Sequence, residues 1–247
     1  MKYALCMSGE MRTYRHTNNS IKHILPDAHI YLHTWKTSTD SWKNAHLDLP
    51  ITKENISKED VLTQYGELVK QCVVESFFDI KDYYTGIECN GYTAKLPSNV
   101  PEKRKIYIDT LYSMYKSFCL YNESSEKYDI VVNIRPDVLL LKKPELYYGP
   151  GIYQSRCPGY NQEFKLNNFF AWGDPLSMEI YYSMFEYCTD IYKKYINERG
   201  QLKGQEVMLQ NYVNETGVPV YDVDLHGQLL RSKDVIETHQ IDYYKPL

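Results

Sequence analysis

No run of apolar residues in this chain approaches the ~20 needed to cross a bilayer. The sequence begins directly with a short apolar segment and shows no secretory signal. It also lacks a run of basic residues: 28 Lys and Arg stand against 32 Asp and Glu, which gives a formal net charge of −4. We therefore expect a cytoplasmic protein with no transmembrane segment and no nucleic-acid partner.

Several metal and cofactor motifs are missing as well. The sequence contains no GxxxxGK followed by Ser or Thr, the phosphate loop of many nucleotide enzymes, and no GxGxxG of dinucleotide-binding folds. Its six cysteines form no CxxC pair and have no zinc-like spacing. Because several of them stand in apolar runs, we expect buried, reduced thiols.

Tyrosine is the abundant residue, with 25 copies against seven Phe and three Trp. Its apolar ring and polar tip suit half-buried surfaces and sites that grip polar, ring-shaped ligands. A compositional bias of the source genome explains the excess equally well. The tyrosines alone therefore assign no function.

Short apolar runs alternate with amphipathic segments through most of the 247 residues. A strand, a helix and a strand within the first 35 residues start a βαβ unit, which requires a parallel sheet. The expected strands span residues 3–7, 28–32, 73–77, 128–134, 138–141, 168–172 and 218–223. The expected helices span residues 14–25 and 105–121, and two more begin at Asp174 and after Gly204, whereas residues 36–60 are expected to form a loop. With no internal repeat, the sequence predicts one α/β domain with a mostly parallel central sheet flanked by helices.

The first candidate site is the loop that follows the opening strand, Ser8-Gly9-Glu10-Met11-Arg12-Thr13. Loops at the carboxyl ends of parallel strands are where open α/β sheets bind ligands. Gly9 allows a ligand to approach the backbone, and Arg12 can make a two-point contact with a diphosphate. An ordinary turn at the end of a strand is the alternative.

The second candidate site is Arg135-Pro136-Asp137, which follows the clearest apolar strand. A carboxylate in a turn between two buried strands can bridge a divalent ion to substrate phosphates. Few oxygen ligands suit Mg²⁺ or Mn²⁺, which keep water and phosphates as further ligands. A turn carboxylate that caps local amides remains the alternative for Asp137.

The third candidate site is Gly204-Gln205-Glu206, at the start of an expected helix. The positive end of the helix dipole favours an ionised carboxylate, which is the form that a general base requires. The same position also suits a glutamate that only stabilises the first turn of the helix. The spacing does not choose between the two.

Five short segments, in this order, resemble those of small GT-A-type glycosyltransferases of large DNA viruses and bacterial surface-polysaccharide clusters. The segments are Ala4 to Gly9 with Arg12, His33-Thr34-Trp35, Tyr128 to Asp137, Asn168 to Gly173, and Gln205 to Leu209. The resemblance implies a GT-A-like, Rossmann-like domain. It also implies that the cytoplasm would be that of a host if the source is a virus.

The resemblance further implies roles for individual residues. The donor nucleotide would be held by the first loop, by the end of the second strand and by a lysine on the helix of residues 105–121. The residues at these three places are Met7, Ser8, Gly9, Arg12, Thr13, His33, Thr34, Trp35 and Lys116. Arg135 and Asp137 would occupy the position of a DxD motif, where Asp137 binds Mn²⁺ or Mg²⁺ and the diphosphate. Asn168 would lie beside the donor sugar, and Glu206 near the acceptor hydroxyl.

Two departures from the family pattern affect the chemistry. The DxD position reads Arg-Pro-Asp, so the metal requirement is expected to be weaker and Arg135 to supply part of the charge neutralisation. Asn168 replaces an aspartate often found there, so the catalytic assignment moves to Glu206 together with Asp137. His226 is a second candidate metal ligand, although a lone histidine is more often structural.

These inferences predict a glycosyltransferase that moves a sugar from a UDP- or GDP-linked donor to a glycan hydroxyl, with metal assistance. Residues 1–140 would bind the nucleotide sugar and residues 141–247 the acceptor. Glu206 acts as a base only if the enzyme inverts the anomeric centre, which the sequence does not decide. A non-catalytic glycan-binding protein on a degenerate transferase fold and a sugar nucleotidyltransferase remain alternatives.

Overall fold

The computed structural model describes residues 1–37, 55–76, 106–143, 149–155, 166–199, 205–223 and 227–229. Gly204 and His226 therefore lie outside the described residues. The strands are β1 (Tyr3–Ser8), β2 (His29–Trp35), β3 (Val69–Glu75), β4 (Ile130–Ile134), β5 (Val138–Leu140), β6 (Ile152–Ser155), β7 (Phe170–Gly173), β8 (Val220–Val223) and β9 (Gly227–Leu229). The helices are α1 (Tyr14–Ile24), α2 (Lys58–Tyr65), the short 3-10 helix η2 (Gly66–Leu68), α5 (Ile106–Asn122), α6 (Pro175–Arg199) and α7 (Gln205–Thr216).

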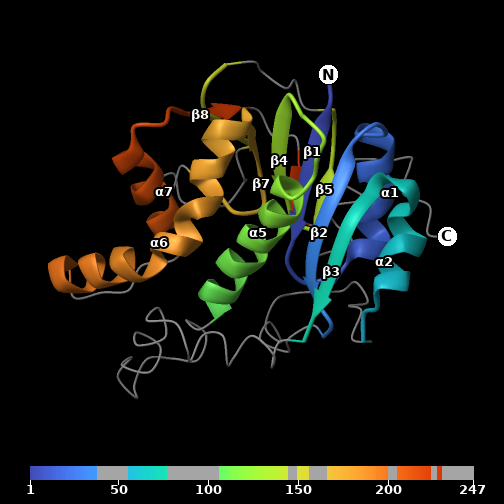
Figure 1. Ribbon diagram of the computed structural model, residues 1–247, viewed down its shortest axis with the longest axis horizontal. Coiled ribbons are helices and arrows are strands. Elements are labelled where there is room, and N and C mark those ends of the chain that lie inside the picture. The colour runs from blue at the N-terminus through green and yellow to red at the C-terminus, as the bar shows by residue number, and fades with distance from the viewer. Residues whose placement is uncertain are drawn as a thin grey trace.

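Seven strands form one twisted sheet in the order β3-β2-β1-β4-β7-β6-β8 (Figure 1). Pairing is parallel from β3 through β2 and β1 to β4, and again between β6 and β8. Only β7 runs antiparallel to its neighbours in this sheet. A small second sheet pairs β5 with β9. The expected fold class, α/β with a mostly parallel sheet flanked by helices, is confirmed.

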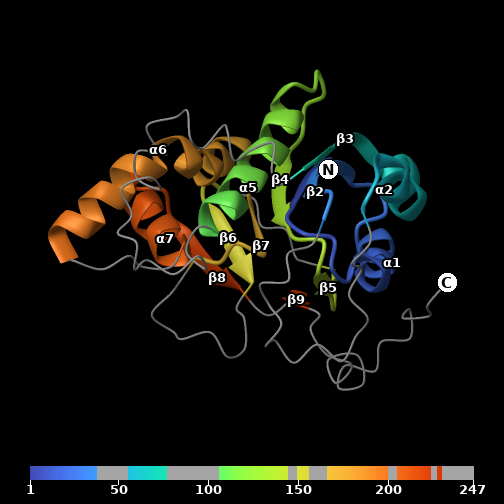
Figure 2. The same cartoon turned by 90° about the horizontal axis from the view of Figure 1, so that it is seen from below.

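The two faces of the sheet are covered by different helices (Figure 2). Because successive side chains of a strand point to opposite faces, Leu5 and Met7 join one buried cluster and Cys6 joins another. The first cluster includes residues of α1 and α2, and the second includes residues of α5, α6 and α7. Cys6 and Cys72 are buried free thiols, as expected, and Cys119 is a partly buried one.

Several elements differ from the sequence-based prediction, and the short elements η2 and β9 were not expected at all. The strand expected at residues 73–77 begins at Val69 and ends at Glu75, four and two residues earlier. Helix α2 lies inside the segment expected to be a loop. The start of α2 is marked in the sequence by a capping box. In it the hydroxyl of Ser57 accepts from the Asp60 amide, and the Asp60 carboxylate accepts from the Ser57 amide. Strand β6 was not expected, because its segment is rich in Gly, Pro and Tyr.

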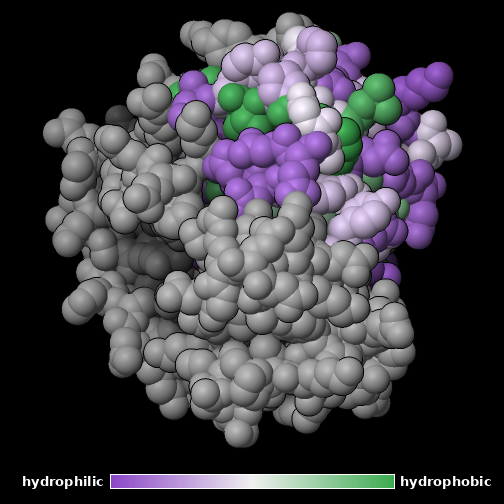
Figure 3. Space-filling view, turned by 90° about the vertical axis from the view of Figure 1, so that its left-hand side faces the viewer, coloured by the Kyte–Doolittle hydropathy of each residue, from purple (hydrophilic) through white to green (hydrophobic). Residues whose placement is uncertain are grey.

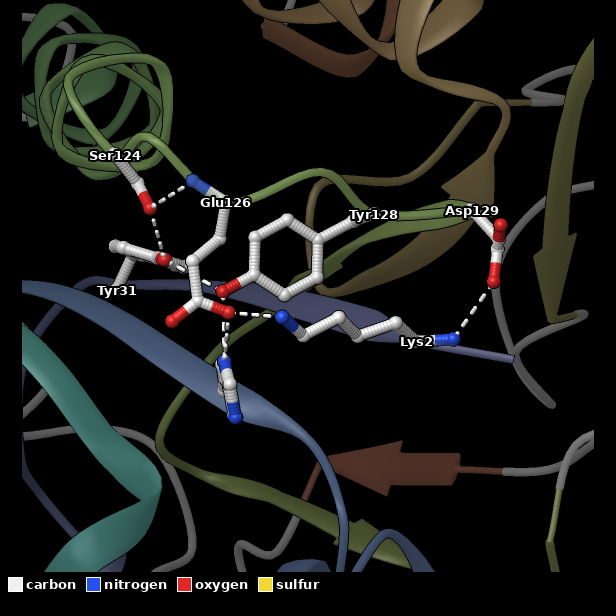
Figure 4. Close-up of polar contacts among 7 residues, drawn as sticks. Lys2, Tyr31, Ser124, Glu126, Tyr128 and Asp129 are labelled. Carbon is white, nitrogen blue, oxygen red and sulfur yellow. Dashed lines mark hydrogen bonds and ion pairs between the residues drawn. The ribbon is translucent and has the colours of Figure 1, made fainter.

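A cluster of polar contacts among residues around Tyr128 stabilises the amino-terminal edge of the sheet (Figure 4). The hydroxyl of Tyr128 lies 2.6 Å from that of Tyr31 and 2.7 Å from Nδ1 of His29. Lys2 binds both ends of the same segment: its amide donates to Asp129 at 2.8 Å, and its ammonium pairs with Glu126. These bonds tie the connection between α5 and β4 to the starts of β1 and β2. They leave the opposite, carboxyl-terminal edge as the place for a ligand.

The described surface offers no single apolar face. Its exposed large hydrophobic residues are scattered over separate elements, namely Met1, Leu62, Leu176, Tyr187 and Tyr221. At the α6 and α7 end, hydrophilic and hydrophobic residues are mixed over the coloured part of the view in Figure 3. Among the helices described, none combines the length and apolar character needed to span a membrane.

Candidate active site

Four of the five sequence segments meet at one edge of the sheet. The parallel strands β1, β2 and β4 end there, at Ser8, Trp35 and Ile134. Because β7 is antiparallel to β4, its start, preceded by Asn168, lies at the same edge. The order of the strands reverses between β1 and β4, since β2 follows on one side of β1 and β4 stands on the other. Open α/β sheets bind ligands outside the carboxyl ends of their strands at such a switch point.

The loop after β1 is held by its neighbours through the backbone of Gly9. The Gly9 amide donates to Oγ of Ser113 on α5 at 3.0 Å, and the Gly9 carbonyl accepts from Oγ1 of Thr34 at 2.7 Å. Gly9 has a φ of +115°, which favours glycine at this position. A Cβ built there would lie 3.9 Å from Cγ of Arg135, so the loops after β1 and β4 lie next to each other. The turn expected from the sequence is thus fixed from two strands and one helix.

The other residues expected to act in this loop have structural partners. Nε of Arg12 donates to Oε2 of Glu10 at 2.7 Å, and both side chains are 11% exposed. Thr13 is buried, and its carbonyl accepts from His16 at 2.8 Å as α1 begins. Met7 is fully buried in the cluster on the α1 face. Arg12 therefore stands at the site edge as half of an ion pair.

His33 is the centre of a buried network at the end of β2. Its Nδ1 lies 2.8 Å from Oγ of Ser113, and its Nε2 lies 3.4 Å from Oε2 of Glu75. Its ring makes edge contacts with Trp35 at 4.9 Å and Tyr112 at 5.6 Å. Burial lowers the pKa of His33 below its ordinary value, so the imidazole is neutral at neutral pH.

The turn after β4 contains the second candidate pair. Arg135 accepts from the Val138 amide at 3.1 Å across this turn, which places Pro136 in its second position. The guanidinium binds both oxygens of Asp137, with Nε to Oδ1 at 2.9 Å and Nη2 to Oδ2 at 2.6 Å. The Asp137 side chain is 4% exposed and that of Arg135 is 18% exposed. The two residues are thus joined in a nearly buried, two-point ion pair.

This pairing bears on the expected metal. A divalent ion needs oxygen ligands that it can reach, and both Asp137 oxygens are hydrogen-bonded to Arg135 inside the turn. Among the residues that the structure describes, no three His, Cys, Asp or Glu side chains lie close enough to hold an ion. As described, the residues at this turn do not fit a Mg²⁺ or Mn²⁺ site. Metal binding at Asp137, which the resemblance implied, is not tested by these contacts, and no step below depends on it.

Asn168 lies on the other side of Arg135. The carbonyl of Phe169 accepts from the Arg135 amide at 3.1 Å, so this segment borders the turn after β4. The Asn168 carbonyl accepts from Nδ2 of Asn133 at 3.1 Å. Asn133, buried in the centre of the sheet, also contacts the hydroxyls of Tyr181 and Tyr182 on α6. Helix α6 thereby fixes the segment that carries Asn168.

Three buried polar atoms at this edge have no hydrogen-bond partner in the described part of the chain: Oγ of Ser8, Nε2 of His33 and Nδ2 of Asn168. Ser8 is 1% exposed and Asn168 is 2% exposed. An unpartnered buried polar group costs about 1–3 kcal/mol, so such groups in a native fold mark strain, water or a ligand. Ser8 and Asn168 flank the turn that carries Arg135.

Lys116 and Glu206 stand at opposite ends of the site. Nζ of Lys116 lies 5.9 Å from the ring centroid of Tyr112, on the β2 and β3 side. Glu206 is in the first turn of α7, as expected. Burial, and then the charge of Glu206, raises the pKa of Tyr181, whose hydroxyl donates to the Asn167 carbonyl at 2.8 Å. Glu206 is therefore on the Asn168 side.

Sequence reasoning missed Glu75, Ser113 and Tyr112, which complete the network around His33. Ser113 stands one helical turn before Lys116, so it lies on the same face of α5 as the lysine that the resemblance implied. Glu75 escaped notice because the expected strand placed it mid-strand. In the structure it is the last residue of β3, at the same edge as His33.

No protein-family model matches this sequence, and no curated protein matches it either. Solved structures similar to it include the galactosyltransferase LgtC in complex with donor and acceptor sugar analogues, with a TM-score of 0.44 and 15% identity over 90% of this chain and 73% of that one. An active-site mutant of LgtC has a TM-score of 0.43 and 13% identity over 90% and 72% of the two chains. The glycosyltransferase GlyE of Streptococcus pneumoniae TIGR4 has a TM-score of 0.42 and 9% identity over 91% and 46%. At TM-scores of 0.44 and below, these similarities carry no assignment for this chain.

Proposed function

We propose that this chain is a glycosyltransferase that moves a sugar from a nucleoside-diphosphate sugar, linked to UDP or GDP, to a hydroxyl of a glycan. One observation carries the proposal: segments more than 150 residues apart in sequence, which resemble the same enzyme family, end at one edge of the sheet. They include Ser8-Gly9, His33-Thr34-Trp35, Arg135-Pro136-Asp137 and Asn168. This edge is also where an α/β sheet of this strand order binds a ligand.

The diphosphate would bind where the loops after β1 and β4 lie next to each other, at Gly9 and Arg135. A guanidinium presents its N–H donors in a planar fork, and Asp137 accepts from Nε and Nη2 of Arg135. Asp137 fixes the orientation of that fork, and the fork matches the geometry of a phosphate. Oγ of Ser8 and Nδ2 of Asn168 would gain in the ligand the partners that they lack in the protein.

Bond breaking at the anomeric carbon leaves negative charge on the departing diphosphate. Arg135, and Arg12 from the neighbouring loop, would offset that charge from fixed positions, so little reorganisation is needed in the transition state. If the reaction inverts the anomeric centre, Glu206 would accept the proton of the acceptor hydroxyl. Its place in the first turn of α7 favours the ionised form that this step requires.

A non-catalytic glycan-binding protein is the second candidate. The observation that favours it is the closed pair of Arg135 and Asp137, which leaves the DxD position without an accessible carboxylate. Such a protein would bind glycan without nucleotide sugar. Binding of nucleoside diphosphates therefore separates the two functions.

The test is a thermal-shift and calorimetric screen of UDP, GDP, CMP and dTDP, followed by their sugar conjugates with glycan acceptors. A ligand that binds only the folded state stabilises it by about 2.7 kcal/mol at a hundredfold excess over its dissociation constant. We expect a selective shift with one nucleoside diphosphate and transfer from the matching sugar donor. The control is the double variant Arg135→Met with Asp137→Asn, which removes both charges and should lose that shift. Glycan binding without any nucleotide shift would contradict the transferase assignment.

A further inference from the structure

Glu75 closes β3 at the same edge as the candidate site but belongs to none of the segments discussed so far. Its Oε2 accepts from the hydroxyl of Tyr112 at 3.0 Å and lies 3.4 Å from Nε2 of His33. Its Oε1 has no hydrogen bond within the described part of the chain, and the side chain is 25% exposed. The carboxylate is thus fixed through one oxygen, on a side chain that is partly exposed.

The surroundings keep this carboxylate ionised. The contact with His33, then those with Tyr112 and Lys116, lowers the pKa of Glu75 below its ordinary value despite partial burial. Burial keeps His33 neutral, and its Nε2 lies 3.4 Å from Oε2 of Glu75 while its Nδ1 lies 2.8 Å from Oγ of Ser113. With a carboxylate on the Nε2 side and a hydroxyl on the Nδ1 side, we assign the proton to Nε2. At neutral pH, Oε1 is therefore an anionic acceptor with no N–H or O–H of its own.

The same network connects Glu75 to the expected diphosphate site. The Gly9 amide binds Ser113, Ser113 binds His33, and His33 faces Glu75. The end of β1 and the end of β3 are two strand spacings apart, roughly 10 Å across the sheet. A nucleoside is about that long. With its diphosphate at Gly9, a bound nucleotide would therefore place its nucleoside over the end of β2, next to Glu75.

We propose that Glu75 binds the nucleoside of the donor by accepting a hydrogen bond from a ribose hydroxyl or a base N–H. This inference rests on the proposed function. A hydroxyl or an N–H can donate to Oε1, whereas a phosphate would be repelled by the like charge. Tyr112 and His33 act as positioning residues, because they hold Oε2 and so orient Oε1.

The alternative is that Glu75 serves only as a partner for His33 and Tyr112. In that case its loss would disturb the network and, through Ser113, the loop of Gly9. Both the diphosphate and the nucleoside would then bind more weakly. A nucleoside contact instead affects only ligands that contain a nucleoside.

The experiment compares Glu75→Gln with the wild-type chain by calorimetric titration with UDP, GDP and inorganic pyrophosphate. We expect the dissociation constant for the nucleotide that the wild type binds to rise at least ~10-fold. A loss of that size is what removing a hydrogen bond to a charged group causes. Pyrophosphate affinity should not change. The matched control is Glu67→Gln, at an exposed position in η2 just before β3, which should bind like the wild type.

A 2′-deoxynucleoside diphosphate identifies the donor group. A penalty of Glu75→Gln that disappears with the 2′-deoxy ligand, or with its 3′-deoxy counterpart, assigns the contact to that ribose hydroxyl. One that persists with both deoxy ligands assigns it to the base. Glu75→Asp, which keeps the charge but withdraws it by one methylene, provides a second variant and should also weaken nucleotide binding.

Two outcomes would overturn the inference while leaving the proposed function standing. Nucleotide affinity in Glu75→Gln equal to the wild type would show that Glu75 makes no contact with the ligand. An equal loss for nucleotide and pyrophosphate would show that it acts only through the network. If the wild-type chain binds no nucleoside diphosphate, the proposed function fails and this inference fails with it.

Discussion

Arg135 and Asp137 hold each other through two parallel hydrogen bonds, of 2.9 and 2.6 Å, inside the turn that follows β4. Sequence alone suggests a carboxylate that binds a metal and an arginine that assists it. The geometry instead joins the two into one neutral pair with a fixed fork. The way in which this chain would hold a diphosphate therefore depends on which member of the pair faces the ligand.

We expect nucleoside diphosphate binding to be unaffected by EDTA and by added Mn²⁺, because Arg135 occupies both oxygens of Asp137. Asp137→Ala should lower the free energy of unfolding by about 2 kcal/mol, since it leaves a largely buried guanidinium without its partner. Titrations with and without Mn²⁺, together with chemical denaturation, check both effects. A Mn²⁺-dependent gain in affinity that Asp137→Asn removes would instead establish Asp137 as a metal ligand.

Ser8→Ala should weaken nucleotide binding without destabilising the fold. Its hydroxyl has no partner in the described chain, so removal costs no protein hydrogen bond and lifts a desolvation penalty. The expected loss of affinity is about fivefold, which corresponds to ~1 kcal/mol. Calorimetry and thermal denaturation measure the two quantities on the same samples.

Ser113→Ala is the matched control for that variant. It removes the same group from a position where the hydroxyl serves Gly9 and His33, so it should lower the free energy of unfolding by about 1 kcal/mol. Ser8→Ala that destabilises the fold as much as Ser113→Ala, with unchanged affinity, would remove Ser8 from the site.

The sheet and the edge that carries the site could be predicted from the sequence because they depend on local patterns. The apolar run before Asp137 predicts a buried strand, and the segment around His33 is recognisable as a strand end. Parallel strands bring such ends together without any information on side chains. The proximity of Gly9 to the turn of Arg135 follows from that arrangement.

Side-chain pairing could not be predicted in the same way. Whether Asp137 points to solvent or back to Arg135 depends on the geometry of a turn and on what packs below it, here Thr17 of α1, whose hydroxyl donates to the Pro136 carbonyl. The role of Glu75 depended on a strand boundary that was wrong by two residues. A charged residue at the carboxyl end of a strand is a candidate ligand-binding residue, whereas one inside a strand is not. An error of two residues in the strand boundary therefore hid Glu75.

Glu206→Gln should reduce turnover strongly while leaving nucleotide affinity unchanged, if the reaction inverts the anomeric centre. The variant keeps the size and the hydrogen bonding of the side chain but removes its ability to accept a proton. Steady-state kinetics give turnover, and calorimetry gives donor affinity. Glu215→Gln, at an exposed position near the other end of α7, is the control and should keep both. A loss of donor affinity with normal turnover would place Glu206 in binding rather than in proton transfer.

The pH dependence of stability should reveal the neutral state of His33. Burial lowers its pKa in the folded chain, so below the ordinary value of about 6.5 the unfolded chain binds the proton more readily. The contribution of His33 to stability is therefore complete above that pH. It declines as the pH falls, by up to ~1.4 kcal/mol per pH unit for one proton.

An NMR titration of the His33 imidazole measures its pKa directly. Denaturation across the same pH range measures the effect on the free energy of unfolding. We expect His33 to titrate below its ordinary value and His33→Asn to flatten the pH dependence. Titration above that value would mean that Glu75 holds an imidazolium. Stability would then decline as the pH rises, and the Nε2–H assignment that orients the free oxygen of Glu75 would be wrong.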